Sequence, residues 1–362
     1  MSRISSSFVI GRHTAFTYKG RAVDLKQVGR ELNVRYVLEG SVQRSGNRFR
    51  VNVQLISAGT GNCLWAERFD KPMADLFDMQ DEIVSRLAST LSAELIAAEA
   101  RRAEHSLHPN SVDLYFQGMA RWNKSWTPEH MSQARGFFER ALELDSDNIE
   151  ALVGIARVDT ASATLLVTDR LVAAEKTLIK ALSLTPHHAV AHTFLGIVLF
   201  ASNRVEQGIA ECEHALALNR NLADAHAALG AAKVFVGRAA ETEGHVQEAM
   251  RLSPRDESVH RWMSDVGLAK LHLDAAAEAV VWLRRCLRTN PNYPIAHFWL
   301  AAAFSFLGQL DEARNAAKAG LALDPTFTIR RFKAFPTTGD TKFRGASKRV
   351  IEGMRMAGIP ES

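Results

Sequence analysis

Residues 189–222 read AVAHTFLGIVLFASNRVEQGIAECEHALALNRNL, and the spacing of small residues in this segment indicates the fold. Leu195-Gly196 lies in its first half, Gly208 follows twelve residues later, and Ala215 follows seven residues after that. Small residues at these places suit two helices that cross closely, because only Gly, Ala or Ser lets the two backbones approach. The stretch therefore predicts one pair of packed helices.

The same pattern recurs along the chain as a small residue followed by an apolar one. It is found at Ala141-Leu142, Ala181-Leu182, Ala215-Leu216, Ala249-Met250, Cys286-Leu287 and Gly320-Leu321. The steps between these copies are 40, 34, 34, 37 and 34 residues, and in four of the six copies a proline stands five positions after the small residue. Proline is expected where a helix must stop. About six helix pairs are therefore predicted over residues 109–325.

This pattern resembles the tetratricopeptide repeat family, whose repeat is about 34 residues long. The resemblance covers roughly residues 110–325. The copies at 111–148, 149–188 and 256–293 carry three to six extra residues, interpreted as longer turns or helices, and Thr242 replaces the usual small apolar residue. A single repeat cannot bury its apolar face, whereas stacked repeats form one core and leave a concave surface for partners. The resemblance implies a protein or peptide ligand.

The first hundred residues change to the period of two that is typical of strands. A strand is predicted at residues 8–10, and a helix at 24–32 with Asp24 as its N-cap. Three antiparallel strands are expected at 36–42, 49–55 and 64–69, followed by a long helix at about 75–104. The turn Gly59-Thr60-Gly61 precedes a strand rather than a helix, so it is interpreted as a turn and not as a nucleotide loop.

The overall prediction is an α+β chain with four parts. A small and possibly truncated α/β domain at 1–75 is followed by a connecting helix at 76–108, by the all-α repeat solenoid at 109–325, and by a capping helix and basic tail at 326–362. In the last part, Phe343, Val350, Ile351 and Met354 fall on one helical face, with basic residues opposite.

The segments VGRELNVRYVLEGSV, LWAERFD, LFDMQDEIV and GMRMAGIPE resemble a bacterial family. In that family an α/β domain related to the amino-terminal domain of TolB precedes tetratricopeptide repeats, mostly in class III adenylate/guanylate cyclases and sometimes in winged-helix transcription regulators. The resemblance implies the carboxy-terminal, non-catalytic part of such a protein. A gene remnant, a split gene and a misplaced start all fit, because the family has one more strand and helix before this point.

Three functions follow from this resemblance. The chain is expected to be a non-catalytic interaction, sensor or scaffold module in signalling. Alternatively, it is the regulatory half of an adenylate cyclase that works with a separate catalytic domain, or of a winged-helix regulator. No residue of this sequence matches the family's catalytic metal ligands, so no catalytic, cofactor-binding or metal-binding residue is predicted.

Two sets of side chains are candidates for partner binding. One histidine recurs in each of four repeats at His192, His226, His260 and His297, and it is expected to pack or to line the groove. A metal ladder is disfavoured because neighbouring helices lie about 8–10 Å apart, whereas metal–nitrogen bonds are about 2 Å long. Trp122 and Trp126, beside Lys124, form either an exposed ligand platform or part of the core.

Charge is unevenly distributed along the chain, whose net charge is +4. Residues 1–75 carry a net charge of +6 and residues 326–362 carry +5, which leaves −7 for the middle. Because the basic residues are dispersed, solvated faces are favoured and no nucleic-acid partner is expected. No secretory signal or membrane segment is evident, so a cytoplasmic location is predicted, with the periplasmic face as the alternative for a membrane-tethered relative. An unpaired edge of the first domain's sheet predicts self-association.

Overall fold

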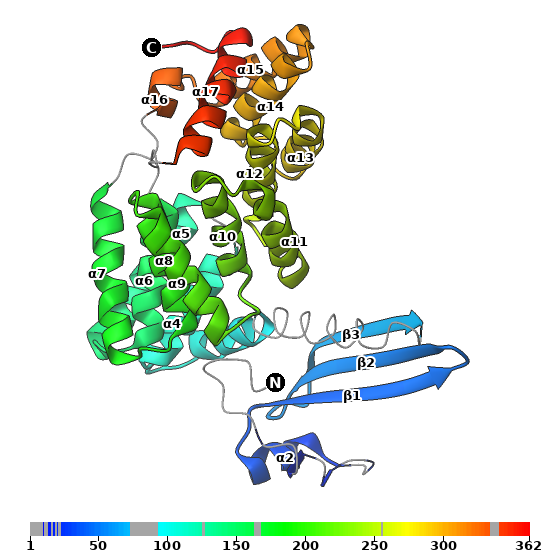
Figure 1. The fold of residues 1–362 in the computed structure, drawn as a ribbon. Coiled ribbons are helices and arrows are strands. Elements are labelled where there is room, and N and C mark those ends of the chain that lie inside the picture. Colours follow the sequence, from blue (N-terminus) through cyan, green and yellow to red (C-terminus); the bar gives the residue numbers. More distant parts are fainter. Residues whose placement is uncertain are drawn as a thin grey trace. The chain divides into compact units, whose positions relative to one another are not determined.

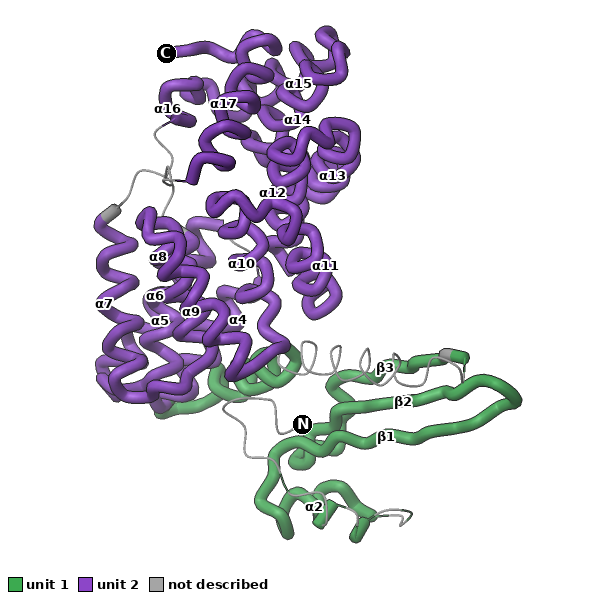
Figure 2. The backbone as a smooth tube through the Cα atoms, in the orientation of Figure 1, with its two compact units in different colours: residues 1–109 green, residues 110–362 purple. Residues whose placement is uncertain are grey.

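The computed structural model describes residues 23–72, 93–124, 127–162, 168–254, 256–333 and 340–362, together with residues 10, 14, 15, 17, 18 and 20. The chain divides into two compact units, residues 1–109 and 110–362 (Figure 2). Most of the strand predicted at 8–10 lies outside the described residues. Of the helix predicted at 75–104, residues 93–104 are helical and residues 75–92 lie outside the described residues.

The first unit contains a short helix and a three-stranded antiparallel sheet. The helix is α2 (Leu25–Leu32), and Asp24 caps it by accepting a hydrogen bond from the Lys26 amide. The strands are β1 (Tyr36–Ser45), β2 (Arg48–Ser57) and β3 (Cys63–Pro72), in the order β1-β2-β3 (Figure 1). The predicted meander and N-cap are confirmed, and each strand is longer than its apolar alternation indicates.

The second unit contains six consecutive helix pairs within the described residues (Figure 1). The pairs are α4 (Ser111–Lys124) with α5 (Pro128–Leu144), α6 (Ile149–Ser162) with α7 (Thr168–Leu184), α8 (Ala189–Ala201) with α9 (Val205–Leu218), α10 (Ala223–Phe235) with α11 (Thr242–Leu252), α12 (Val259–His272) with α13 (Ala276–Thr289), and α14 (Pro294–Phe306) with α15 (Leu310–Leu323). A single 3₁₀ turn, η2 (Ala239–Glu241), precedes α11. Two further helices, α16 (Ile329–Lys333) and α17 (Thr341–Met356), end the chain.

The recurring small residues lie in the last turn of the second helix of each pair. In all six copies the small residue is buried, and its carbonyl accepts a hydrogen bond from the amide four positions later. The extra residues of the first two copies lengthen the second helices, because α5 and α7 have 17 residues whereas α9 has 14. Thr242 is buried, and its hydroxyl donates to the Gly230 carbonyl at 2.8 Å, so its polar group is satisfied.

The first helices of the pairs lie on the inner side of the stack. Each first helix contacts the first helix of the next pair, from α4 through to α14. Among the described residues, the second helices make far fewer contacts with one another. A stack curves toward the side on which its elements are closer together, so the first helices form the concave face.

The C-terminal helix α17 packs onto this inner face. It contacts α12 and α14, and its Phe343 ring stacks on Phe235 of α10 with the ring centroids 4.9 Å apart. The apolar face predicted for this helix is confirmed, because Phe343, Val350, Ile351 and Met354 are all buried. Helix α17 therefore covers the inner face of the last three pairs.

Among the described helices, none combines the length and apolar content that crossing a bilayer requires.

Candidate functional site

A guanidinium joins three neighbouring first helices on the inner face. Arg157 of α6 lies over the Phe194 ring of α8 at 4.7 Å and over the Trp122 ring of α4 at 5.8 Å from the ring centroids. Its Nη1 lies 3.8 Å from the Met119 sulfur. Its Nε is buried and has no hydrogen-bond partner among the described residues. Cation–π contacts orient the guanidinium, and a buried donor without an acceptor favours a ligand that supplies one.

Carboxylates and a phenol extend this surface across four pairs. Burial raises the pKa of Asp224 on α10 to about 6, the negative charge of Asp256 adds to this, and Arg157 opposes it. Tyr115 of α4 hydrogen-bonds to Glu150 of α6, and burial followed by that carboxylate raises the pKa of its phenol. We call Tyr115, Trp122, Glu150, Arg157, Phe194 and Asp224 the inner strip. It combines aromatic, cationic and acidic groups, the side chains that dominate the energetics of protein interfaces.

Three of the four candidate histidines hydrogen-bond to the turn before their own helix. The Nε2 atoms of His192, His226 and His297 lie 2.9, 3.1 and 3.0 Å from the carbonyl oxygen six residues earlier. Each ring therefore donates from Nε2–H to the turn that joins two pairs. His260 differs, because its Nδ1 contacts the Glu257 carbonyl at 2.9 Å and its ring meets the edge of Tyr293. The histidine recurs because the turn to which it hydrogen-bonds recurs between pairs.

The two candidate tryptophans are described unequally. Trp122 is 7% exposed and packs against Arg157, so it is a buried member of the inner strip. Trp126 lies outside the described residues.

Within the described ranges, no three His, Cys, Asp or Glu side chains gather in a way that could hold a metal ion. Cys212 and Cys286 are buried, and burial raises the pKa of each thiol to about 12.

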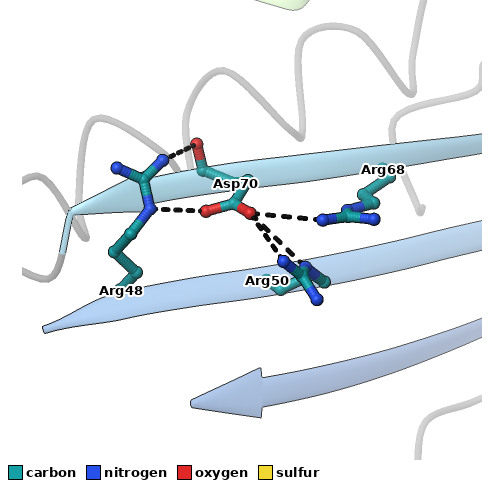
Figure 3. A network of polar contacts seen from close by, with 4 residues as sticks. All are labelled: Arg48, Arg50, Arg68 and Asp70. Atoms are coloured by element: carbon teal, nitrogen blue, oxygen red, sulfur yellow. Dashed lines mark hydrogen bonds and ion pairs between the residues drawn. The ribbon is translucent and has the colours of Figure 1, made fainter. Parts of the chain in front are cut away.

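A second polar cluster lies in the first unit, at the end of the β2–β3 ladder. Asp70 of β3 accepts from Arg48 Nε at 2.8 Å and from Arg50 Nη2 at 3.1 Å, both on β2, and lies 3.5 Å from Arg68 (Figure 3). Hydrogen bonds from Arg48 and then Arg50 lower the pKa of Asp70 to about 2. The three arginines are exposed and all pair with the Asp70 carboxylate, and we assign the group to strand pairing rather than to ligand binding.

Asp265 of α12 gives the repeat unit a defined pH dependence. Burial raises the pKa of this carboxyl from 3.8 to about 7, and Arg261 lowers it only in part. Between these values the folded protein holds a proton that the unfolded chain has lost, so this group makes stability fall as pH rises. Asp265→Asn is therefore expected to stabilise the protein more at pH 8 than at pH 5, by on the order of 2 kcal/mol.

Urea unfolding at the two pH values measures this difference. Asp311→Asn makes the same substitution at a side chain that is 91% exposed and is the matched control. Equal stabilisation of Asp265→Asn at pH 5 and pH 8 would show that the carboxyl titrates normally.

The inner strip is largely made of residues that the sequence does not single out. Arg157, Phe194 and Asp224 occupy the ninth, sixth and second positions of their helices, so they do not repeat with the period that identified the histidines. The available signal was an arginine directly after the apolar run ALVGIA in the first helix IEALVGIARVDTAS.

Comparisons with known proteins agree with this architecture. A model of the tetratricopeptide repeat matches residues 282–315. A Rhizobium meliloti (strain 1021) protein named "Putative adenylate cyclase 3" is 41% identical over 150 residues, which cover 40% of this chain and 25% of the relative. The chain thus matches a quarter of the length of that relative.

Two solved structures share the fold. A chain of the APC/C hetero-tetramer Cut9-Hcn1 matches with a TM-score of 0.55 and 17% identity, over 68% of this chain and 46% of the other. A monomeric mutant of IFIT1 with Gppp-AAAA matches with a TM-score of 0.51 and 15% identity, over 76% of this chain and 66% of the other. At these identities the likeness concerns the fold alone. The chain has a small three-stranded sheet followed by a helical solenoid of the tetratricopeptide type.

Proposed function

We propose that this chain is a non-catalytic protein-interaction module that binds a protein or peptide partner on the inner strip. The observation that carries the proposal is Arg157, which is oriented by two aromatic rings from neighbouring helices and whose buried Nε–H finds no acceptor among the described residues. A partner carboxylate would pair with the charge of this guanidinium, whose side chain is partly exposed. Arginine beside tryptophan on a curved repeat surface is the composition of an interface centre.

The covered part of the inner face supports the same proposal. Helix α17 uses Phe343, Val350 and Met354 to fill the surface of α12 and α14 and reaches Phe235 of α10. This helix shows in cis that the inner face accepts an amphipathic helix. The inner strip lies on α4, α6, α8 and the start of α10, and we assign it to a partner in trans.

Charge reversal at Arg157 tests the proposal. Proteins captured from cells by the wild-type chain would be compared with those captured by Arg157→Glu and by Lys176→Glu, which makes the same charge change on the exposed surface of α7. The partner is expected to be lost with Arg157→Glu and retained with Lys176→Glu. Calorimetry with the purified partner should then show at least about tenfold weaker binding for Arg157→Glu, as removal of an interface centre requires.

Equal binding by the two variants, with unchanged circular dichroism, would place the partner elsewhere.

The alternative function is the regulatory half of an adenylate cyclase. The 41% identity to the Rhizobium meliloti protein supports it. This alternative expects the purified chain to make no cyclic nucleotide from ATP or GTP, but to change the rate of a catalytic domain from that relative when the two are mixed. An unchanged rate would favour the interaction module without a cyclase.

A further inference from the structure

The first unit contains a cavity of about 630 Å³ that is open to solvent. Its walls come from α2, from the start of β1, from the turn between β2 and β3, and from the helical residues 93–104. A Cβ added at Gly29 of α2 would lie 2.6 Å from the Ala58 Cβ, so the helix and the turn are in direct contact and hold two walls in place. Small-molecule sites have volumes of about 300–1,000 Å³.

Five cationic side chains line this cavity. They are Lys26, Arg30, Arg35, Arg101 and Arg102. The described lining contains no Asp or Glu side chain. The remaining polar lining includes Asn33, Ser57, Thr60 and Asn62, all able to donate a hydrogen bond. The cavity therefore concentrates positive potential and donor groups in one small volume.

A buried carboxylate behind the wall fixes two of these cations. Glu99 is 4% exposed, and it accepts from Arg35 Nη1 at 2.6 Å, from Arg102 Nε at 2.8 Å and from the Tyr36 hydroxyl at 2.9 Å. Burial raises the pKa of Glu99, but the hydrogen bonds from Arg102, Arg35 and Tyr36 together outweigh it and leave the pKa below its ordinary value. Glu99 is thus ionised, and it orients two guanidinium groups while neutralising a single charge.

Lys26 and Arg101 lack partners within the described part of the chain, whereas Arg30 is attracted to the neighbouring Glu31. The side chains of Lys26 and Arg101 make no hydrogen bond or ion pair there. The Lys26 Cε lies over the turn, 3.5 Å from the position of a Cβ at Gly61. In that turn, the backbone amides of Gly59 and Thr60 donate to no described acceptor. Like charges held close together without counter-ions favour a bound anion.

From this geometry we infer that the cavity is a binding site for a small phosphate-bearing molecule with at least two negative charges. Guanidinium groups held in a fixed orientation recognise phosphate oxygens through paired N–H donors, and turn amides add further donors. The cavity is formed within the first unit alone, so the inference does not depend on partner binding by the solenoid. It assigns a ligand-binding role to a domain whose part in the proposed function is otherwise unspecified.

Calorimetry on the full chain with inorganic pyrophosphate and with ATP tests the site at low ionic strength. Saturable one-to-one binding of at least one of these probes is expected, weakening as salt is added. Arg101→Glu should weaken it by about tenfold or more, and Lys26→Glu should do the same. Arg44→Glu is the matched control, because Arg44 is an exposed cation of β1 outside the cavity lining, and its effect should stay within about twofold.

Three results would overturn the inference. The first is no saturable binding of either probe. The second is equal weakening by Arg44→Glu and Arg101→Glu, which would indicate only the general positive field of the unit. The third is binding to phosphatidylglycerol vesicles, but not to phosphatidylcholine vesicles, without binding of either soluble probe, because the phosphate would then be recognised only on a lipid surface. Unchanged circular dichroism of each variant confirms that a loss of binding is local.

Discussion

Phe138→Ala is expected to lower the free energy of unfolding of the repeat unit by about 3–5 kcal/mol. The Phe138 ring of α5 is fully buried. It lies against two glycines on neighbouring first helices, because a Cβ at Gly118 or Gly154 would meet the ring at 2.5 and 2.8 Å. Removing the ring would open a cavity between α4, α5 and α6 that no neighbouring side chain can fill, because two of its walls are glycine. Urea unfolding followed by circular dichroism at 222 nm measures the change.

Phe137 of α5 provides the control for this prediction. It is partly exposed and stands beside the Arg140 guanidinium, 5.7 Å from its ring centroid. Phe137→Ala removes the same group from the same helix without opening a closed cavity, so its effect should be clearly smaller. Comparable losses for the two variants would mean that the contact between the ring and the two glycines contributes nothing beyond ordinary burial.

The helix pairs could be predicted from sequence because each pair obeys a local rule. The residue at Ala215 or Ala249 must be small because two helices cross there, and the helix ends three residues later. The strands of the first unit followed from the alternation around β2, where Val53 and Leu55 are buried. These features depend on neighbours in the chain, which a single sequence displays.

The position of α17 could not be predicted in this way. Its apolar face was evident, but an apolar face does not say what covers it. The contacts of Phe343 with Phe235 and His272 join residues that are 108 and 71 positions apart. Only the curvature of the stack, with first helices inside, brings α10, α12 and α14 under one helix.

The candidate sites could not be predicted from the sequence for a related reason. Periodicity drew attention to the histidines, yet a feature that recurs from pair to pair reports what the repeat needs, and three of these histidines hydrogen-bond to the preceding turn. The inner strip does not repeat, since a surface that distinguishes one partner has different side chains on each helix. The cationic cavity is assembled from three segments around Arg30, Thr60 and Arg101, and the burial of Glu99 is a tertiary property. The loop at Gly59 is a turn, as predicted, but it also forms a wall of that cavity.

Gly208→Ala is expected to destabilise the repeat unit by about 3 kcal/mol, at the upper end of the usual cost of overpacking. Helices α8 and α9 cross where Gly208 faces Gly196. A Cβ at Gly208 would lie 2.6 Å from the Gly196 carbonyl oxygen and 3.0 Å from the Phe200 nitrogen. Both are backbone atoms, so no side-chain rotation can relieve the clash and the two helices must separate.

Gly244→Ala in α11 is the matched substitution with the opposite expected sign. A Cβ at Gly244 meets nothing within 4 Å, and its φ is helical. Alanine there should stabilise the protein by about 0.5–1 kcal/mol, because it restricts the unfolded chain and favours the helix. The same chemical change in two helices should therefore shift the urea midpoint in opposite directions. If Gly208→Ala were neutral or stabilising, α8 and α9 would not cross at backbone contact, and the small residues of the repeat would reflect helix propensity rather than packing.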